Sequence, residues 1–274
     1  MRFTFYCICC IFYCTTAFAQ TESGSQKLPA DSGYFSSFDG TKIYYESRGK
    51  GKTILLVHGF IVNSSSWKKT MLYTDLLNKG YRVVLSDLRG NGHSDKPHDS
   101  TAYDNDAEAK DIMLLMDKLR IKSYAAIGYS RGSIITARLL VLDKRVKAAV
   151  LGGMGIEFTN PAWPRRLMFY HALRGEEVPE LKGAMDYVEQ QKLDRLALAW
   201  MQRSQPSTSQ DVLSKVQQPV LVVWGKEDQY SSTAPELAKL FPHFTTATVP
   251  GEHGDASQSA DFSIAVQSFF KQHF

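Results

Sequence analysis

The sequence predicts an α/β protein in which helices wrap a mostly parallel sheet, with a helical cap inserted near one edge. The first support is a set of apolar runs that are continuous rather than alternating, as expected for strands covered on both faces. These runs span residues 53–57, 81–85, 124–127, 146–151, 220–224 and 245–249. The second support is a helical pattern between most runs, at residues 67–77, 107–119, 133–142, 235–240 and 262–270. With 43% hydrophobic and 22% charged residues, the 274-residue chain can bury the core that this sheet requires.

A β-hairpin is expected ahead of the parallel strands. Residues 34–38 and 41–47 flank Asp39-Gly40, a pair that favours a tight two-residue turn. Gly49-Lys50-Gly51 then ends the strand pattern. The hairpin should therefore form an antiparallel leading edge of the sheet.

One segment, at about residues 155–215, interrupts the alternation of strands and helices. Its helical patterns lie at residues 164–173, 179–190 and 192–203. Because open α/β sheets bind ligands at the C-terminal ends of their strands, we expect this segment to cap that edge. Its large apolar residues, among them Trp163, Phe169 and Trp200, are candidates for the substrate pocket. The alternative is that they hold the cap to the core, as most buried aromatic residues do.

The first 19 residues differ in composition from the rest and predict a signal peptide. Arg2 gives a positive start, residues 3–18 are mostly apolar, and Ala17-Phe18-Ala19 resembles a cleavage site. Residues 20–32 are polar and are expected to be a flexible segment ahead of a domain at residues 33–274. The alternative is an uncleaved membrane anchor, for which the apolar stretch is short.

Export and cleavage would leave a chain without cysteine, because all four cysteines lie within the first 19 residues. Such a chain forms no disulfide and depends on its core for stability. Asn63-Ser64-Ser65 matches a glycosylation motif, but a glycan there would crowd the loop that we expect beside the active serine. We therefore interpret the motif as unused, and we expect export to a bacterial periplasm or secretion.

Chemistry is first indicated by the pattern G-x-S-x-G at residues 128–132. It joins an apolar strand to a helical pattern, and such a sharp turn exposes the hydroxyl of Ser130 to a neighbouring base. The glycines are needed because a side chain at either position would collide where strand and helix cross closely. The pattern alone is weak evidence, since chance yields it in about one chain in ten. Its meaning therefore depends on suitable partners elsewhere in the chain.

A serine hydroxyl becomes a nucleophile when a histidine takes its proton and a carboxylate orients that histidine. Asp228 and His253 each follow an apolar strand pattern, so both should lie in loops at the sheet edge that carries Ser130. Glu227, adjacent to Asp228, is the alternative acid. His58 lies in a turn after another strand pattern and could support the site.

The reaction also needs hydrogen-bond donors for the negative charge that develops on the substrate oxygen. One should be the main-chain N–H of Arg131, immediately after the serine. The other should be the N–H of Phe60, in the loop after the strand at residues 53–57. Because both donors belong to the main chain, we expect the side chains at these two positions not to matter.

These motifs resemble the α/β-hydrolase fold superfamily, and in particular its single-domain, esterase-like members. The resemblance covers roughly residues 34–274 and rests on residues 58–60, 87–94, 128–132, 225–228 and 251–253. The order Ser130, Asp228, His253 is that of the family. The resemblance implies a structural role for the loop at residues 87–94. Relatives that open epoxides or remove halogens carry aspartate as the nucleophile, so Ser130 argues against both activities. Glu252 departs from the glycine that more usually precedes the catalytic histidine.

The sequence thus predicts an exported serine hydrolase that acts on a carboxylic ester or related acyl substrate without a cofactor. It has no zinc-binding motif, cysteine cluster in the mature chain or phosphate-binding loop, so no metal is expected. Lysine and arginine are scattered at a net charge of +4, which does not favour nucleic acid as a partner. We expect a small-molecule acyl substrate, no protein partner and no stable membrane insertion after cleavage. Amide, lactone, thioester and C–C bond cleavage, acyl transfer, and a receptor-like protein with little activity all remain open.

Overall fold

The computed structural model describes residues 30–274 of the chain. The expected signal peptide at residues 1–19 and residues 20–29 of the expected flexible segment lie outside the described residues. Among the helices that are described, none is long and apolar enough to cross a membrane.

A single eight-stranded sheet runs through the molecule in the order β1-β2-β4-β3-β5-β6-β7-β8. The strands are β1 Ala30–Ser36, β2 Lys42–Arg48, β3 Thr53–Val57, β4 Arg82–Ser86, β5 Tyr124–Tyr129, β6 Val146–Gly152, β7 Val220–Gly225 and β8 Phe244–Val249. The hairpin β1–β2 and the pair β2–β4 are antiparallel, and every other pairing is parallel. The predicted class, a mostly parallel sheet with an antiparallel leading edge, is confirmed.

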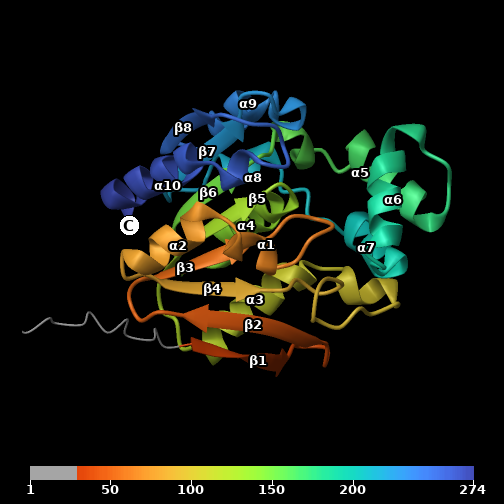
Figure 1. Ribbon diagram of the computed structural model, residues 1–274, viewed down its shortest axis with the longest axis horizontal. Helices are drawn as coiled ribbons and strands as arrows, with labels where there is room; N and C mark the ends of the chain where they lie inside the picture. The colour runs from red at the N-terminus through yellow and green to blue at the C-terminus, as the bar shows by residue number, and fades with distance from the viewer. Residues whose placement is uncertain (1–29) are drawn as a thin grey trace, which may run out of the picture.

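Helices cover both faces of this sheet (Figure 1). Helices α3 Ala107–Lys118, α4 Arg131–Leu142 and α9 Ala234–Ala238 contribute to the apolar core on one face. Helices α2 Met71–Asn78 and α10 Ala260–His273 contribute to the core on the other face. Residues of β3 and β5 are buried along their whole length, which explains why these strands read as continuous apolar runs.

Two elements differ from expectation. Strand β1 begins at Ala30, so the last three residues of the segment expected to be flexible pair with β2, beginning with Ala30 opposite Arg48. Main-chain pairing makes a strand here even though residues 30–32 carry no large apolar side chain. The helix expected at residues 67–77 is two helices, α1 Ser65–Lys68 and α2, because the Thr70 side chain caps α2 by accepting from the N–H of Tyr73.

The segment between β6 and β7 contains no strand, as predicted, and forms a helical cap at the C-terminal ends of the parallel strands (Figure 1). The cap elements are η2 Ile156–Thr159, α5 Pro164–Arg174, η3 Pro179–Leu181, α6 Lys182–Gln190 and α7 Arg195–Arg203, whereas α8 Gln210–Leu213 contacts α4 and places Leu213 in the core of the main domain. Cap residues such as Leu173, Val188 and Leu198 form a small core of their own with Tyr103 from the main domain. The cap is therefore an internally packed unit over the sheet edge rather than a loose loop.

Candidate active site

Ser130 occupies a sharp turn between β5 and α4. Its backbone has φ 55° and ψ −127°, a conformation that a residue with a side chain rarely adopts. A Cβ on Gly128 would lie 2.2 Å from the carbonyl oxygen of Gly132, and a Cβ on Gly132 would lie 2.2 Å from that of Val57. These approaches confirm the steric reason for both glycines. The turn is strained, and its close packing holds the serine at the end of β5.

His253 connects this serine to a carboxylate. Its Nε2 lies 2.9 Å from Oγ of Ser130, and its Nδ1 lies 2.9 Å from Oδ2 of Asp228. A carboxylate can only accept here, so Nδ1 carries the ring proton and Nε2 is left to accept from the serine hydroxyl. Three residues separated by up to 123 positions thus form one hydrogen-bonded chain, with the base already in the tautomer that can remove a proton.

Asp228 is 6% exposed and sits in the turn after β7, where its carboxylate also accepts from Tyr230 N–H and from the Ser231 hydroxyl. Burial opposes its ionisation, but the hydrogen bonds from His253 and Ser231 outweigh that effect. The pKa of the Asp228 carboxyl therefore lies below its usual value. The alternative acid, Glu227, instead accepts from the main-chain N–H of Gly251 at 2.8 Å. Glu227 steadies the loop that carries His253 without contacting its ring.

The imidazole of His253 is also held by two aromatic neighbours that the sequence did not single out. The ring of Tyr129 packs at 5.6 Å and that of Tyr230 at 5.4 Å, measured between ring centroids. The Tyr129 hydroxyl donates to the carbonyl oxygen of His253 at 2.9 Å. Because the ring and its main chain are both fixed, His253 faces Ser130 without needing to reorganise.

The loop after β3 lies directly beside the serine. A Cβ on Gly59 would lie 3.6 Å from Cβ of Ser130, so the chain passes within van der Waals contact of the turn. Outside helices and strands, no main-chain hydrogen bond of residues 30–274 uses the N–H of Phe60 or of Arg131. The two N–H groups predicted to stabilise the oxyanion therefore have no main-chain hydrogen-bond partner within the described residues.

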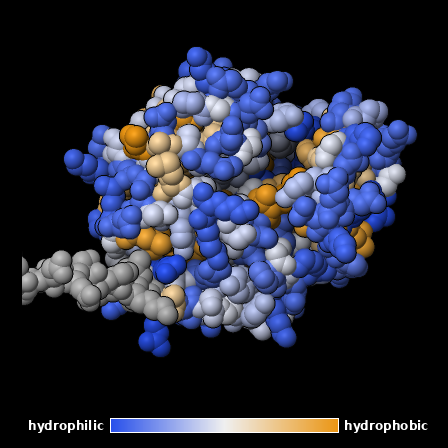
Figure 2. All heavy atoms as spheres, in the orientation of Figure 1, coloured by the Kyte–Doolittle hydropathy of each residue, from blue (hydrophilic) through white to orange (hydrophobic). Residues whose placement is uncertain are grey.

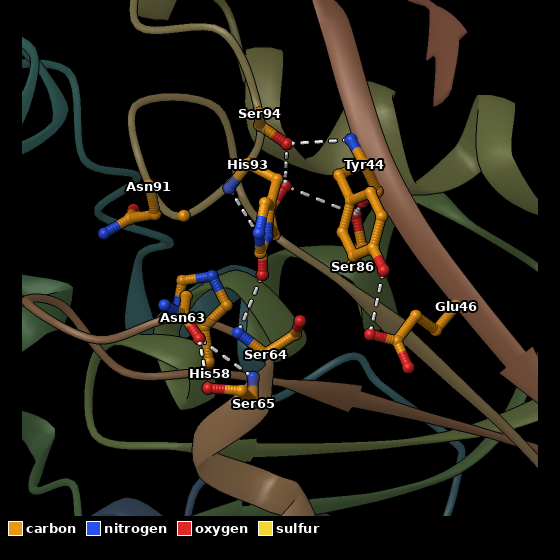
Figure 3. Close-up of polar contacts among 12 residues, drawn as sticks. Tyr44, Glu46, His58, Asn63, Ser64, Ser65, Ser86, Asn91, His93 and Ser94 are labelled. Carbon is orange, nitrogen blue, oxygen red and sulfur yellow. Dashed lines mark hydrogen bonds and ion pairs between the residues drawn. The ribbon is translucent and has the colours of Figure 1, made fainter. Parts of the chain in front are cut away.

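A network beneath this loop fixes its position (Figure 3). Asn91 donates from Nδ2 to the carbonyl oxygens of Phe60 and Val62, at 2.8 and 3.0 Å. Asp87 accepts from the main-chain N–H groups of Ser64 and His93, at 2.8 and 2.7 Å. The loop after β4 thus braces the loop after β3, which fits the structural role expected for residues 87–94.

His58 belongs to this scaffold rather than to the reactive chain. It is 1% exposed, its Nε2 accepts from the N–H of Leu88 at 3.0 Å, and its Nδ1 donates to the carbonyl of Gly59 at 2.7 Å. Burial lowers the pKa of the His58 imidazole, so the ring is neutral and joins the two loops.

A cavity of about 530 Å³ opens above Ser130 between the sheet domain and the cap. Figure 2 shows apolar surface around a hollow between the main body and the cap helices. Trp163 and Phe169 line the cavity, together with Phe60 of the loop after β3. Phe60 and Phe169 meet edge to face with centroids 5.5 Å apart. The expected pocket residues Trp163 and Phe169 therefore do lie at the cavity.

Trp200, the third expected pocket residue, does not line the cavity, so the prediction that it contributes to the pocket is wrong. Its indole N–H donates to the carbonyl oxygen of His98 at 2.9 Å, and its ring packs near Tyr170. The polar contact turns the side chain toward the loop after β4. Trp200 thus joins the cap to the main domain, which is the alternative role that the sequence left open.

The side chain of Arg131 also departs from expectation, because it is buried and forms an ion pair. It is 3% exposed, and Nη1 and Nη2 donate to the two carboxylate oxygens of Glu108 at 2.7 and 2.6 Å. Nη2 also donates to the carbonyl oxygen of Met201 in the cap at 3.1 Å. The residue after the serine therefore ties the turn to α3 and to α7. Nothing in the sequence pairs Glu108 with Arg131, which are 23 positions apart.

Residues 30–274 contain no cluster of three or more histidine, cysteine, aspartate or glutamate side chains that could hold a metal ion. The chemistry available at the site is that of an activated hydroxyl beside a histidine, a buried carboxylate and two unengaged N–H groups. A carbonyl carbon placed at Ser130 would meet a nucleophile, a base and an oxyanion site together. Such a combination of fold and side-chain chemistry is typical of hydrolases.

Comparison with known proteins finds similarity to enzymes of this fold. Residues 52–180 match the family described as alpha/beta hydrolase fold. A non-heme chloroperoxidase from Streptomyces lividans is 28% identical over 260 residues, which cover 81% of this chain and 93% of that protein. Epoxide hydrolase 3 from Siraitia grosvenorii is 35% identical over 129 residues, 46% of this chain and 40% of that protein.

Three relatives that are 32–44% identical are each matched over only 39–43% of their own length. Among solved structures, a hydrolase from Pseudomonas aeruginosa PA01 superposes with a TM-score of 0.73 at 20% identity, covering 88% of this chain and 98% of that one. The chain therefore has the α/β-hydrolase fold, and residues 52–180 match the model of that family.

Proposed function

We propose that this protein is a serine hydrolase that cleaves carboxylic esters through an acyl-enzyme. The observation that carries the proposal is the hydrogen-bonded chain from Ser130 through His253 to Asp228, with 2.9 Å at both contacts, at the floor of a cavity. A cavity of about 530 Å³ is of the size that holds a small organic ligand.

In the proposed reaction, His253 takes the hydroxyl proton as Oγ of Ser130 bonds to the ester carbonyl carbon. The N–H groups of Phe60 and Arg131 stabilise the oxygen that becomes negative. As the tetrahedral intermediate collapses, the carbon–oxygen bond to the alcohol breaks and His253 returns the proton to the leaving oxygen. Water, deprotonated by His253, then attacks the acyl group, and the acid leaves as Ser130 regains its proton.

The relatives are named for different activities, and the residue at position 130 helps to choose among them. Serine attacks acyl carbon atoms, and an acyl-serine ester is readily hydrolysed by the same base. Because position 130 is serine, we do not carry over the epoxide-opening activity named for the Siraitia relative.

Acyl transfer is a second candidate, favoured by the chloroperoxidase that aligns over 93% of its length. Hydrogen peroxide in place of water would attack the acyl-serine, lose a proton to His253 and depart as a peracid. That product, rather than any cofactor, would then be the oxidant of a halide. Peracid formation from an ester and hydrogen peroxide, measured beside ester hydrolysis, shows whether peroxide or water accepts the acyl group.

We also propose export of the protein, on the basis of the composition of residues 1–19. The mass of the secreted chain should correspond to a start at Gln20. A mass that includes residues 1–19 would contradict cleavage and favour a membrane anchor.

A fluorophosphonate probe tests the proposed nucleophile directly, because it reacts only with a serine activated by a base. Peptide mapping should place the label on Ser130 and not on Ser66 or Ser257, whose residues line the same cavity and serve as internal controls. Labelling should rise together with loss of 4-nitrophenyl ester hydrolysis. A chain that binds esters but is neither labelled nor active would instead fit the receptor-like alternative.

A further inference from the structure

The cavity wall carries an unbalanced positive charge. Four of its residues are cationic, namely Lys69, Arg131, Arg165 and Arg166, whereas none is an aspartate or a glutamate. Arg131 is neutralised by its ion pair with Glu108. Lys69 is exposed, so solvent and salt screen its charge. The charges that need an explanation are those of Arg165 and Arg166, both on the cap helix α5.

Arg166 is half-buried, and within residues 30–274 its hydrogen bonds all go to main-chain carbonyl oxygens. Nη1 donates to Gln205 at 3.3 Å, and Nη2 donates to Pro161 at 2.6 Å. Its Nε is buried without a hydrogen-bond partner in the described part of the chain. Burial also lowers the pKa of the Arg166 guanidinium, and no acidic group opposes that effect. Carbonyl groups satisfy some of its donors but leave its charge uncompensated.

Arg165 is likewise without an acidic partner. Within residues 30–274 neither arginine forms an ion pair. The Arg165 guanidinium lies 3.9 Å from the ring centroid of Tyr230, the residue that packs against His253. Stacking on an aromatic ring stabilises a cation without neutralising it. Arg165 is therefore a charge held next to the reactive histidine.

Both arginines also occupy an unfavourable place in their helix. They stand in the first turn of the 11-residue helix α5, which contains no acidic residue. The N-terminal end of a helix carries partial positive charge, and cations there are destabilising. Carbonyl groups and aromatic rings hold the two side chains but supply no counter-charge, whereas an anion in the cavity would be attracted by the helix end and by both side chains.

We propose that the cavity receives esters that carry a free carboxylate, bound by Arg166 with Arg165 beside it. This inference rests on the proposed ester hydrolysis at Ser130. The planar guanidinium matches a carboxylate in shape and can donate two parallel hydrogen bonds to it. The neighbouring Trp163 and Phe169 suit the hydrocarbon that links the carboxylate to the ester. Gln202 and Gln205, each 5% exposed, add polar groups to the same wall.

Two pairs of esters test this proposal on the full chain. The first compares 4-nitrophenyl hemiglutarate with 4-nitrophenyl pentanoate, which have acyl chains of equal length and differ in one carboxylate. The second compares the butyrate esters of 3-hydroxybenzoate and 3-hydroxybenzamide, which place the charge on the alcohol part. We expect kcat/KM to favour the charged ester by about tenfold or more in one pair, as for a charge-assisted hydrogen bond. That pair shows which half of the substrate carries the carboxylate.

Variants then assign the preference. Arg166→Gln should lower the ratio of charged to neutral kcat/KM by about tenfold, whereas Arg166→Lys should retain part of the preference. Arg174→Gln removes one positive charge from the same helix at an exposed position outside the cavity, and it should leave the ratio unchanged. A ratio below about twofold in both pairs, or a ratio that Arg166→Gln does not lower, would overturn the proposal.

Binding separates this inference from the proposed reaction. Calorimetry on Ser130→Ala should show glutarate binding more tightly than pentanoate, with the difference lost in the double variant that adds Arg166→Gln. If no ester is hydrolysed but glutarate binding depends on Arg166, the reaction is wrong and the carboxylate site stands. If esters are hydrolysed without charge preference and glutarate does not bind, the reaction stands and the carboxylate site is wrong.

Discussion

The sheet edge and the cap lie on opposite sides of one cavity and are built on different principles. At the sheet edge, Ser130 and Asp228 follow the buried strands β5 and β7, His253 follows the largely exposed edge strand β8, and hydrogen bonds join the three side chains. In the cap, Trp163, Phe169 and Arg166 are only half-buried, and all three belong to helix α5 or its N-cap. The difference teaches that the reacting groups depend on the strongest part of the core, whereas the groups facing the rest of the substrate sit where change is tolerated.

Three contacts join the cap to residues in or beside the reactive chain. Arg131 reaches from the serine turn to the Met201 carbonyl, Phe60 meets Phe169, and Arg165 stacks on Tyr230. Each of these contacts begins at a residue within the site or next to it. Substitutions at the sheet edge should therefore change the rate for every substrate, while substitutions in the cap should change the order of substrates.

The largest effect is expected at the nucleophile. Ser130→Ala should lower kcat by roughly 10⁴–10⁶ for all esters alike, because the acyl-enzyme can no longer form. Steady-state rates on short and long 4-nitrophenyl esters measure this loss. An alanine variant that kept most of its activity, or that lost it for one ester only, would place the nucleophile elsewhere.

The next effect distinguishes the two neighbouring acids. Asp228→Asn should lower kcat by about 10³–10⁴, because an amide no longer selects the histidine tautomer that accepts from serine. Glu227→Gln is the matched control and should cost less than about tenfold, since Glu227 contacts only the N–H of Gly251. The reverse ranking in folded variants would exchange the roles of the two carboxylates.

Breaking the ion pair behind the serine should weaken the fold as well as the site. Glu108→Gln leaves Arg131 buried without a counter-charge, which typically costs about 3–5 kcal/mol of unfolding free energy. Urea denaturation measures this loss. Glu180→Gln, an exposed acid in the cap, is the control and should change stability by less than about 0.5 kcal/mol. Equal stability of the two variants would show that the pair contributes little.

Cap substitutions should have smaller effects that depend on the substrate. Trp163→Ala and Phe169→Ala should change the ratio of kcat/KM for short and long acyl esters by about tenfold, because both side chains line the cavity. Trp200→Ala should leave that ratio unchanged and lower the melting temperature, because Trp200 binds the main domain through His98. A changed acyl preference in Trp200→Ala alone would reverse this assignment.

The smallest effect concerns acid stability at the sheet edge. The pKa of Asp228 is lower in the folded chain, so its ionised form stabilises the fold above the unfolded value of about 3.9. That contribution is lost as pH falls through the folded pKa. Urea midpoints of the parent chain and of Asp228→Asn should therefore differ at pH 6 and converge below about pH 4. A gap that does not narrow at all as pH falls below about 4 would mean that the carboxylate's charge is not its source.

The sequence predicted which residues lie at the sheet edge because short local patterns mark them. Two glycines around Ser130 and an acid after a strand leave recognisable patterns, since strand ends recur at one edge of a parallel sheet. The cap obeys no such rule. Whether Trp163 or Trp200 faces the cavity depends on one hydrogen bond to His98, and the partner of Arg131 lies on another helix. Such choices are made by packing between distant segments, which periodicity does not record.

The cap begins after β6 and returns at β7, and these two strands are direct neighbours in the sheet. A chain that leaves and re-enters a domain at adjacent points can be lengthened, shortened or exchanged there with little disturbance to the remainder. Related enzymes could therefore trade whole caps, and so acquire new substrates in one genetic event. Each exchanged cap would have to meet one requirement. The incoming segment must offer an oxygen where Met201 now meets Arg131, or the recipient must give up its arginine.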